Sequence, residues 1–137
     1  MKKRISKFLS MILVFSCITA TLSTVSATSI EPRYTGLFNA AVSLNISSGG
    51  QANPFCSAKL RTGYTADVTL ELQRSTNGYS WSSIKEWTGS GSSMISLDKT
   101  YYVTSGYEYR SKCSVKVYDS SNNLVDSIIE YSSTVSY

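Results

Sequence analysis

The segment YEYRSKCSVKVY, residues 107–118, alternates between two kinds of side chain along its whole length. One face would carry Tyr107, Tyr109, Ser111, Cys113, Val115 and Val117. The other face would carry Glu108, Arg110, Lys112, Ser114, Lys116 and Tyr118. A period of two with one apolar face is typical of a half-buried β-strand. We therefore expect this segment to line a core with its first set of side chains.

The same alternation occurs before and after this segment. The side chains expected to face inward are Phe38, Ala40, Val42, Leu44 and Ile46, then Cys56, Ala58 and Leu60, then Val68, Leu70 and Leu72, and finally Val125, Ser127, Ile129 and Tyr131. Residues 81–87, 94–97 and 101–103 are shorter strand candidates, and no stretch has sustained helical periodicity. The sequence predicts an all-β protein, a single antiparallel β-sandwich of about seven strands over residues 34–137.

Turn signals separate these strands. Asn77-Gly78 predicts a tight hairpin turn, because this pair readily adopts positive φ angles. Ile84 breaks the parity that Trp81 and Trp87 share, and a bulge near Ser82-Ser83 would reconcile them. Pro54 predicts an edge or bulge where its strand begins. Residues 88–93, rich in Gly and Ser, predict a loop.

The first 27 residues have the three parts of a secretory signal peptide. Residues 1–7 are basic, residues 8–20 (FLSMILVFSCITA) are apolar, and Val25-Ser26-Ala27 has the small side chains that a signal peptidase recognises. We expect cleavage between Ala27 and Thr28, a short leader over residues 28–33, and a secreted, extracellular protein, with association with the cell envelope as the alternative. Two alternatives fit the sequence less well. A membrane anchor would need a longer apolar run than residues 8–20. A lipoprotein signal ending at Cys17 would need a small residue where the bulky Phe15 stands.

Removing the signal peptide leaves two cysteines, Cys56 and Cys113. An even pair in an exported chain predicts one disulfide bond. The alternative is two unpaired buried thiols that behave as small hydrophobic groups.

Charge and composition exclude several classes of function. The chain has 13 basic and 9 acidic residues and no histidine. Four of the basic residues lie in the signal peptide, so 13 − 4 leaves 9 basic against 9 acidic residues and a neutral body. A neutral body argues against nucleic-acid binding, and the lack of histidine removes His-dependent catalysis and His metal sites. We expect no enzyme, no cofactor and no membrane contact after the signal is removed.

Three features together resemble an immunoglobulin-like sandwich: a cysteine in the second strand, a hairpin bearing tryptophan, and Tyr-x-Tyr leading to a cysteine in the penultimate strand. In that fold the two cysteine strands lie in opposite sheets, which the disulfide joins. The position two before the second cysteine, where such domains carry a tyrosine, is Ser111, and Tyr109 is the nearest substitute on the same face.

The chain also resembles a family of small exported proteins of Gram-positive, largely gut-dwelling bacteria with no assigned function. The resemblance covers most of residues 33–137. It is carried by Tyr34-Thr35-Gly36, VTLELQ at residues 68–73, Trp81 and Trp87, YYVT at residues 101–104, and GYEYR at residues 106–110 through VYD at 117–119. These motifs are structural in kind, so the resemblance implies no catalytic residue.

Candidate chemistry is sparse. Glu71 and Glu86 could face each other across the hairpin as glycosidase carboxylates do, although two solvated charges explain them better. Oxygen donors gather near one turn at Asp119, Asn122, Asn123 and Asp126, and either calcium binding or ordinary turn chemistry accounts for them.

The sharper candidate is an aromatic group, Tyr79, Trp81 and Trp87, which could stack on sugar rings or form a protein contact, unless one or both tryptophans belong to the core. The sequence favours an extracellular binding module for a glycan or protein. The alternative is a structural or envelope-associated protein that assembles through strand edges. Exposure of both tryptophans on one surface would favour the binding module. A long uncovered edge strand together with buried tryptophans would favour the structural protein.

Overall fold

The computed structural model describes residues 33–137, and every regular element in that range is a β-strand. The strands are β1 (Leu37–Ile46), β2 (Gln51–Leu60), β3 (Thr65–Ser75), β4 (Ser82–Ser92), β5 (Met94–Asp98), β6 (Tyr101–Tyr102), β7 (Glu108–Tyr118), β8 (Leu124–Tyr131) and β9 (Val135–Ser136). The expected signal peptide, its cleavage site and all of the leader but Arg33 lie outside the described residues. Residues 33–137 contain no helix that could cross a membrane.

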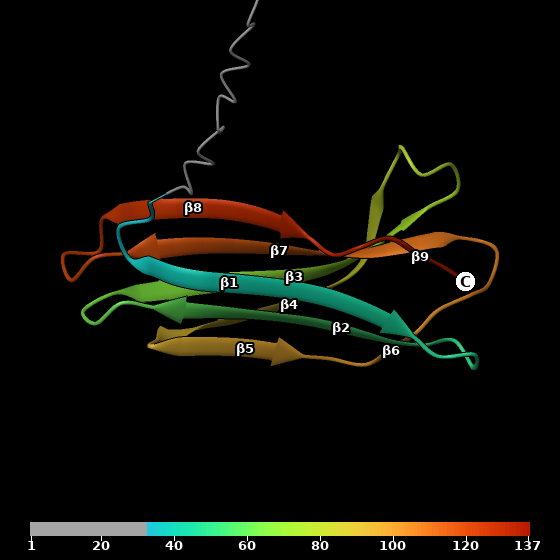
Figure 1. Ribbon diagram of the computed structural model, residues 1–137, viewed down its shortest axis with the longest axis horizontal. Coiled ribbons are helices and arrows are strands. Elements are labelled where there is room, and N and C mark those ends of the chain that lie inside the picture. The colour runs from blue at the N-terminus through green and yellow to red at the C-terminus, as the bar shows by residue number, and fades with distance from the viewer. Residues whose placement is uncertain (1–32) are drawn as a thin grey trace, which may run out of the picture. The chain divides into compact units, whose positions relative to one another are not determined.

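The strands form two antiparallel sheets that pack face to face (Figure 1). One sheet has the order β1-β2-β5, with β6 also pairing with β2. The other has the order β4-β3-β7-β8, with β9 also pairing with β7. The predicted all-β sandwich is therefore confirmed. It has nine strands rather than about seven, because β6 and β9 each add a two-residue pairing.

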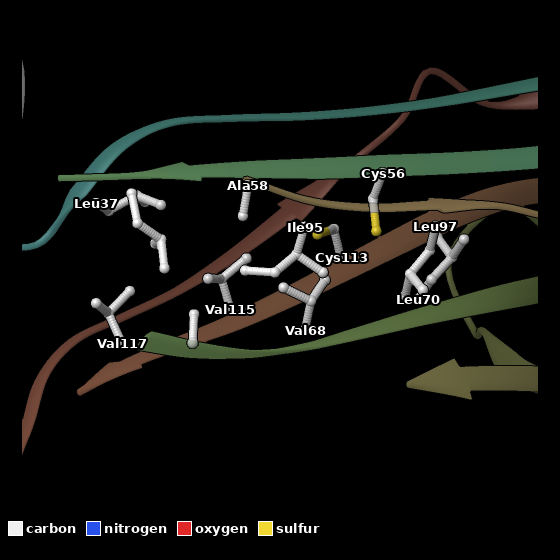
Figure 2. Close-up of a cluster of buried hydrophobic side chains, with 12 residues drawn as sticks. Leu37, Cys56, Ala58, Val68, Leu70, Ile95, Leu97, Cys113, Val115 and Val117 are labelled. Atoms are coloured by element: carbon white, nitrogen blue, oxygen red, sulfur yellow. The ribbon is translucent and has the colours of Figure 1, made fainter. Parts of the chain in front are cut away.

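The core lies between the three central strands, β2, β3 and β7 (Figure 2). β2 and β7 keep strict alternation, and β3 keeps it as far as Leu72, so every second side chain of these stretches is shielded from water. The predicted inward sets are buried as expected: Cys56, Ala58 and Leu60 from β2, Val68, Leu70 and Leu72 from β3, and Tyr109, Ser111, Cys113, Val115 and Val117 from β7. Ile95 and Leu97 of β5 and Leu37 of β1 complete the core.

Cys56 and Cys113 lie on facing sheets, fully buried, and are separate thiols in the structure (Figure 2). A hydrogen bond between the two side chains raises the pKa of Cys56 far above its ordinary value, and burial raises it further. The two side chains therefore face each other across the core (Figure 2).

The start of β1 departs from the expectation. Phe38 was expected to face inward, but it is 59% exposed, and Leu37 fills the core position. The cause is a register shift: Leu37 pairs with Leu60 and Asn39 with Lys59, so Phe38 has no partner. A β-bulge of this kind turns the extra side chain out of alternation, and the rest of β1 keeps the predicted faces.

A second β-bulge changes the face that β8 was expected to turn inward. Ile129 and Tyr131 were expected to be inside, but they are 54% and 47% exposed, while Ile128 packs against the core. Val117 pairs with Asp126 and Tyr118 with Leu124, so Val125 is skipped in the register. One extra residue exchanges the two faces of the strand beyond it.

The β3–β4 hairpin also differs from the prediction. Its connection runs over residues 76–81 instead of a two-residue turn, and of Asn77 and Gly78 only Gly78 has a positive φ angle. Ser75 Oγ accepts the backbone N–H groups of Asn77 and Gly78, and Asn77 Oδ1 accepts those of Tyr79 and Ser80. These side-chain bonds satisfy the turn backbone and stabilise a wider loop.

Residues 88–92, predicted to be a loop, continue β4 instead. Ser93 alone separates β4 from β5, with a φ angle of 71°, and its carbonyl accepts the Leu60 N–H at 2.7 Å. The chain thus crosses from one sheet to the other in a single residue. Gly89 fits this corner because a Cβ there would lie 3.0 Å from Leu97 Cδ2.

Candidate binding site

The three aromatic residues singled out in the sequence do not share a surface. Trp87 lies opposite Leu70 on the inner face of β4, where it packs against the core and meets Tyr101 edge to face. Tyr79 is 91% exposed in the β3–β4 connection, which projects beyond the sheets in Figure 1. Trp81 lies against Arg110 of β7. The three residues therefore do not form one patch, the alternative that a tryptophan belongs to the core applies to Trp87, and Trp81 is the member that leads to a site.

Arg110 lies between two aromatic rings on the outer face of the five-stranded sheet. Its Cζ atom is 4.2 Å from the centroid of Trp81 and 4.1 Å from the centroid of Tyr131. Trp81 reaches it from the β3–β4 hairpin and Tyr131 from β8, the strand on the other side of β7. Arg110 Nε donates a hydrogen bond of 2.9 Å to Gln73 Oε1. We call Trp81, Arg110, Tyr131 and Gln73 the Arg110 stack.

Two β-bulges place the rings of Trp81 and Tyr131 on the same outer face of the five-stranded sheet. In β4, Leu72 pairs with Lys85 and Gln73 with Ser83, so Ile84 is skipped. This confirms the bulge predicted near Ser82-Ser83, and it places Trp81 on the face opposite Trp87. In β8, the bulge at Val125 turns Tyr131 outward in the same way. Without both extra residues, the alternation of β-strands would direct both rings inward.

A chain of polar contacts fixes the base of the stack. Gln73 is almost fully buried although it lies on the outer face, and its Nε2 donates to Glu71 Oε2 at 3.2 Å and to Ser83 Oγ at 3.4 Å. Glu71 Oε1 accepts a hydrogen bond and ion pair of 2.8 Å from Lys112 Nζ. Because β3 and β7 both contribute, the orientation of the Arg110 guanidinium is held by the sheet itself.

Glu71 does lie opposite Glu86 in the register of β3 and β4, as the sequence allowed. Burial raises the pKa of Glu71, but hydrogen bonds from Lys112 and Ser83 outweigh burial and lower it below the usual value. A carboxylate with a lowered pKa is a poor proton donor near neutral pH. Glu71 is therefore suited to holding Gln73 and Lys112 in place.

The possible calcium ligands do not converge. Asp119 accepts the backbone N–H groups of Ser121 and Asn123 within its own turn. Asp126 instead accepts the N–H groups of Thr35, Gly36 and Leu37 at 2.7–3.0 Å, which joins β8 to the chain entering β1. Among the described residues, no three acidic or cysteine side chains are grouped as a metal would require.

A shallow cleft of about 450 Å³ lies at the other end of the same sheet face. Its lining residues are Thr65, Ala66, Asp67, Ser90, Gly91, Tyr118 and Asn122. Hydroxyl, amide and carboxylate groups predominate, with the Tyr118 ring as the main flat surface. The Arg110 stack and this cleft therefore lie toward opposite ends of β7.

Sequence reasoning missed Arg110, Gln73 and Tyr131 as site residues. Arg110 was correctly placed on an outer face, yet nothing local connects it with Trp81, which is 29 positions earlier. The parity break at Ile84 was the available signal, since a bulge there implies that Trp81 and Trp87 face opposite ways.

Comparisons with known proteins leave the family open. No family model matches the chain, and no curated protein matches it. Among solved structures, the chain is similar to one described as a "putative beta-galactosidase" from Bacteroides fragilis, with a TM-score of 0.40 and 16% identity. The match covers 67% of this chain and 15% of that protein, so the chain spans a small fraction of its length.

Proposed function

We propose that the protein is an exported, non-catalytic β-sandwich module that binds a glycan on the outer face of the β4-β3-β7-β8 sheet. The Arg110 stack is the observation that carries this proposal. Flat aromatic rings beside fixed hydrogen-bonding groups suit sugar rings, which have apolar faces and hydroxyl edges. Here the rings of Trp81 and Tyr131 flank a guanidinium that β3 and β7 hold in place.

The surroundings of the stack favour a glycan over a protein partner. The outward positions between the stack and the cleft are polar: Thr69, Thr88 and Ser114 carry hydroxyl groups, and the positions on either side of them are charged, at Glu71, Glu86, Lys112 and Lys116. The cleft adds Ser90 and Asn122. A protein interface has an apolar centre within a polar rim. On this face the exposed apolar side chain near Tyr131 is Ile129, which lies on the outer strand rather than at the centre.

A glycan array with the mature protein tests the proposal, followed by calorimetric titration of any hit. Trp81→Ala and Tyr131→Ala should each weaken binding about five-fold or more, because a stacked ring contributes about 1–3 kcal/mol when buried by a ligand. Tyr79→Ala is the matched control, since Tyr79 is a more exposed aromatic residue of the same hairpin outside the stack.

Equal losses in Tyr79→Ala and Trp81→Ala would place the site elsewhere and contradict the proposal. The same would follow if the array gave no hit while a defined extracellular protein bound in a Trp81-dependent manner, which would assign the face to a protein partner.

The proposal includes export and a disulfide bond. Intact-mass analysis of the secreted protein should show Thr28 as the first residue, and a lipid on Cys17 or an uncleaved chain would refute this. In an oxidising compartment, the contact between Cys56 and Cys113 supports their oxidation to a disulfide.

We further infer that the sandwich is immunoglobulin-like. The order β1-β2-β5 against β4-β3-β7-β8 puts the two cysteine strands, β2 and β7, in facing sheets as in that fold. Tyr109 also supports the inference: its buried ring sends the hydroxyl back to the Thr104 carbonyl, 2.5 Å away and five residues upstream. A tyrosine at the start of the penultimate strand makes this bond in immunoglobulin-like domains.

Strand edges support a second candidate, an envelope-associated protein that assembles through its sheets. The eleven-residue β4 and the eight-residue β8 each pair with a neighbour on one side within residues 33–137. Unpaired edges of this length can add a further strand. Light scattering on the mature protein tests this: concentration-dependent oligomers abolished by Ser127→Pro in β8 would support it, and a monomer at high concentration would refute it.

A further inference from the structure

The charge of Arg110 lacks an acidic partner in the described part of the chain. There the ion pair is Lys112 with Glu71, and the hydrogen bond of Arg110 goes to a neutral amide, Gln73. The two rings that lie against Arg110, those of Trp81 and Tyr131, are also uncharged. Glu108 lies two positions earlier on the same face of β7 but makes no ion pair with Arg110. An arginine held without a counter-charge is ready to pair with an anion supplied by a ligand.

The contacts of Arg110 leave its outer N–H groups available. A guanidinium has five N–H donors in one plane, and the bond to Gln73 uses Nε. The rings approach Arg110 from the two sides of β7. The two parallel N–H donors that remain on the Nη atoms suit a planar carboxylate, which an arginine binds in bidentate fashion.

We propose that Arg110 selects a carboxylate-bearing sugar, of the uronic acid class, whose ring stacks on Trp81 or Tyr131. This inference rests on the proposed glycan-binding function. The carboxylate accepts two hydrogen bonds from the Arg110 Nη groups, and the flanking rings exclude water from that pair. A neutral sugar leaves the guanidinium without its partner, so the site discriminates by charge as well as by shape. Lys112 contributes less, because Glu71 already neutralises it.

The experiment compares the binding of tetragalacturonic acid with that of its methyl ester, using calorimetry on the mature protein. We expect the acid to bind at least about ten-fold more tightly than the ester, since charge-assisted bidentate pairs are the stronger hydrogen bonds. Arg110→Gln should abolish this preference and Arg110→Lys should retain part of it. Lys116→Gln is the matched control, because Lys116 is an exposed cation on the outer face of the same strand, outside the stack.

Equal losses in Lys116→Gln and Arg110→Gln would indicate general charge attraction and overturn the inference. Preference for a sulfated tetrasaccharide over the uronate would overturn the carboxylate assignment. Equal binding of acid and ester that still depends on Trp81 would refute the carboxylate inference while leaving the glycan proposal intact. If Arg110→Gln fails to fold, the salt dependence of acid and ester binding by the native protein decides the question, because only the acid should weaken with salt.

Discussion

The central strands and the outer strands of this sandwich follow different rules. β2 and β7 bury alternate side chains along their whole length, β3 does so from Thr65 to Leu72, and β3 pairs with β7 over eleven positions without a shift. β1, β4 and β8 each skip one residue, at Phe38, Ile84 and Val125. The bulges turn Phe38, Trp81 and Tyr131 to the surface. The central strands thus hold the fold together, while irregularities of the outer strands determine which aromatic groups meet solvent.

The cross-sheet cysteine pair gives the largest expected effect on the central region. In oxidised protein, Cys56→Ala and Cys113→Ala should each lower the free energy of unfolding by roughly 4 kcal/mol, because the bond would restrain an unfolded loop of about 57 residues. The double variant should cost little more than either single one. Titration of thiols in the denatured, unreduced mature protein should find none, and two free thiols would refute the disulfide.

Next in size is the contrast between one buried and one exposed aliphatic side chain. Leu70→Ala in β3 should cost about 3 kcal/mol, because it leaves a cavity at a fully buried site. Ile129→Ala in β8 should change stability by no more than about 0.5 kcal/mol. Urea unfolding measures both, and similar losses would mean that the outward face of β8, which carries Ile129, is buried in solution.

Asp126 tests the link between β8 and the entry to β1. Asp126→Asn should lower stability by about 1–2 kcal/mol, a range that allows for partial exposure, because the carboxylate accepts three backbone N–H groups. Burial raises the pKa of Asp126, but these bonds outweigh burial and lower it. The stabilisation should therefore be complete above the unfolded pKa of about 4 and be lost as the pH falls below it.

Asp126→Asn also serves as the control for the pH dependence, because an asparagine at this position cannot titrate. Thermal unfolding between pH 6 and pH 2 should show a smaller acid loss in Asp126→Asn than in the native chain. Parallel curves would mean that Asp126 contributes no such linkage.

The smallest effect should come from the bulge of β1. Phe38→Ala should change stability by no more than about 0.5 kcal/mol, since the exposed ring is held by weak contacts with Lys59 and Arg61. Its neighbour Leu37 is the matched control, and Leu37→Ala should cost several-fold more because that side chain is buried. Equal costs would show that the bulge does not separate the two residues as described.

Prediction from the sequence succeeded where side-chain chemistry alone sets the structure. The alternation around Cys56, Leu70 and Cys113 was sufficient, because a strand with two neighbours in its sheet cannot slip without exposing its apolar face. It failed for Phe38, Ile129 and Tyr131 because a bulge depends on the register with a partner strand, which no local pattern records. The bulge at Ile84 was foreseen because two tryptophans of equal parity flank the misfit.

The candidate site was only partly predictable for a related reason. Trp81 could be singled out by its residue type, but Arg110 and Tyr131 come from other strands, and their meeting depends on the order of strands in the sheet. The wider loop at Asn77 and the extension of β4 past Thr88 likewise depend on tertiary contacts. Gly89 shows this, since a Cβ at this position would lie only 3.0 Å from Leu97 Cδ2 of the facing sheet.

The single-residue crossover at Ser93 bears on how the protein folds. Bringing two segments together costs chain entropy that grows with the length of the loop between them. The β3–β4 hairpin and β5 are contiguous, so the facing sheets can first meet there before the distant partners β1 and β8 arrive. Lengthening this corner with six Gly/Ser residues after Ser93 should therefore slow refolding more than it speeds unfolding. Stopped-flow kinetics would show the opposite if the sheets first meet elsewhere.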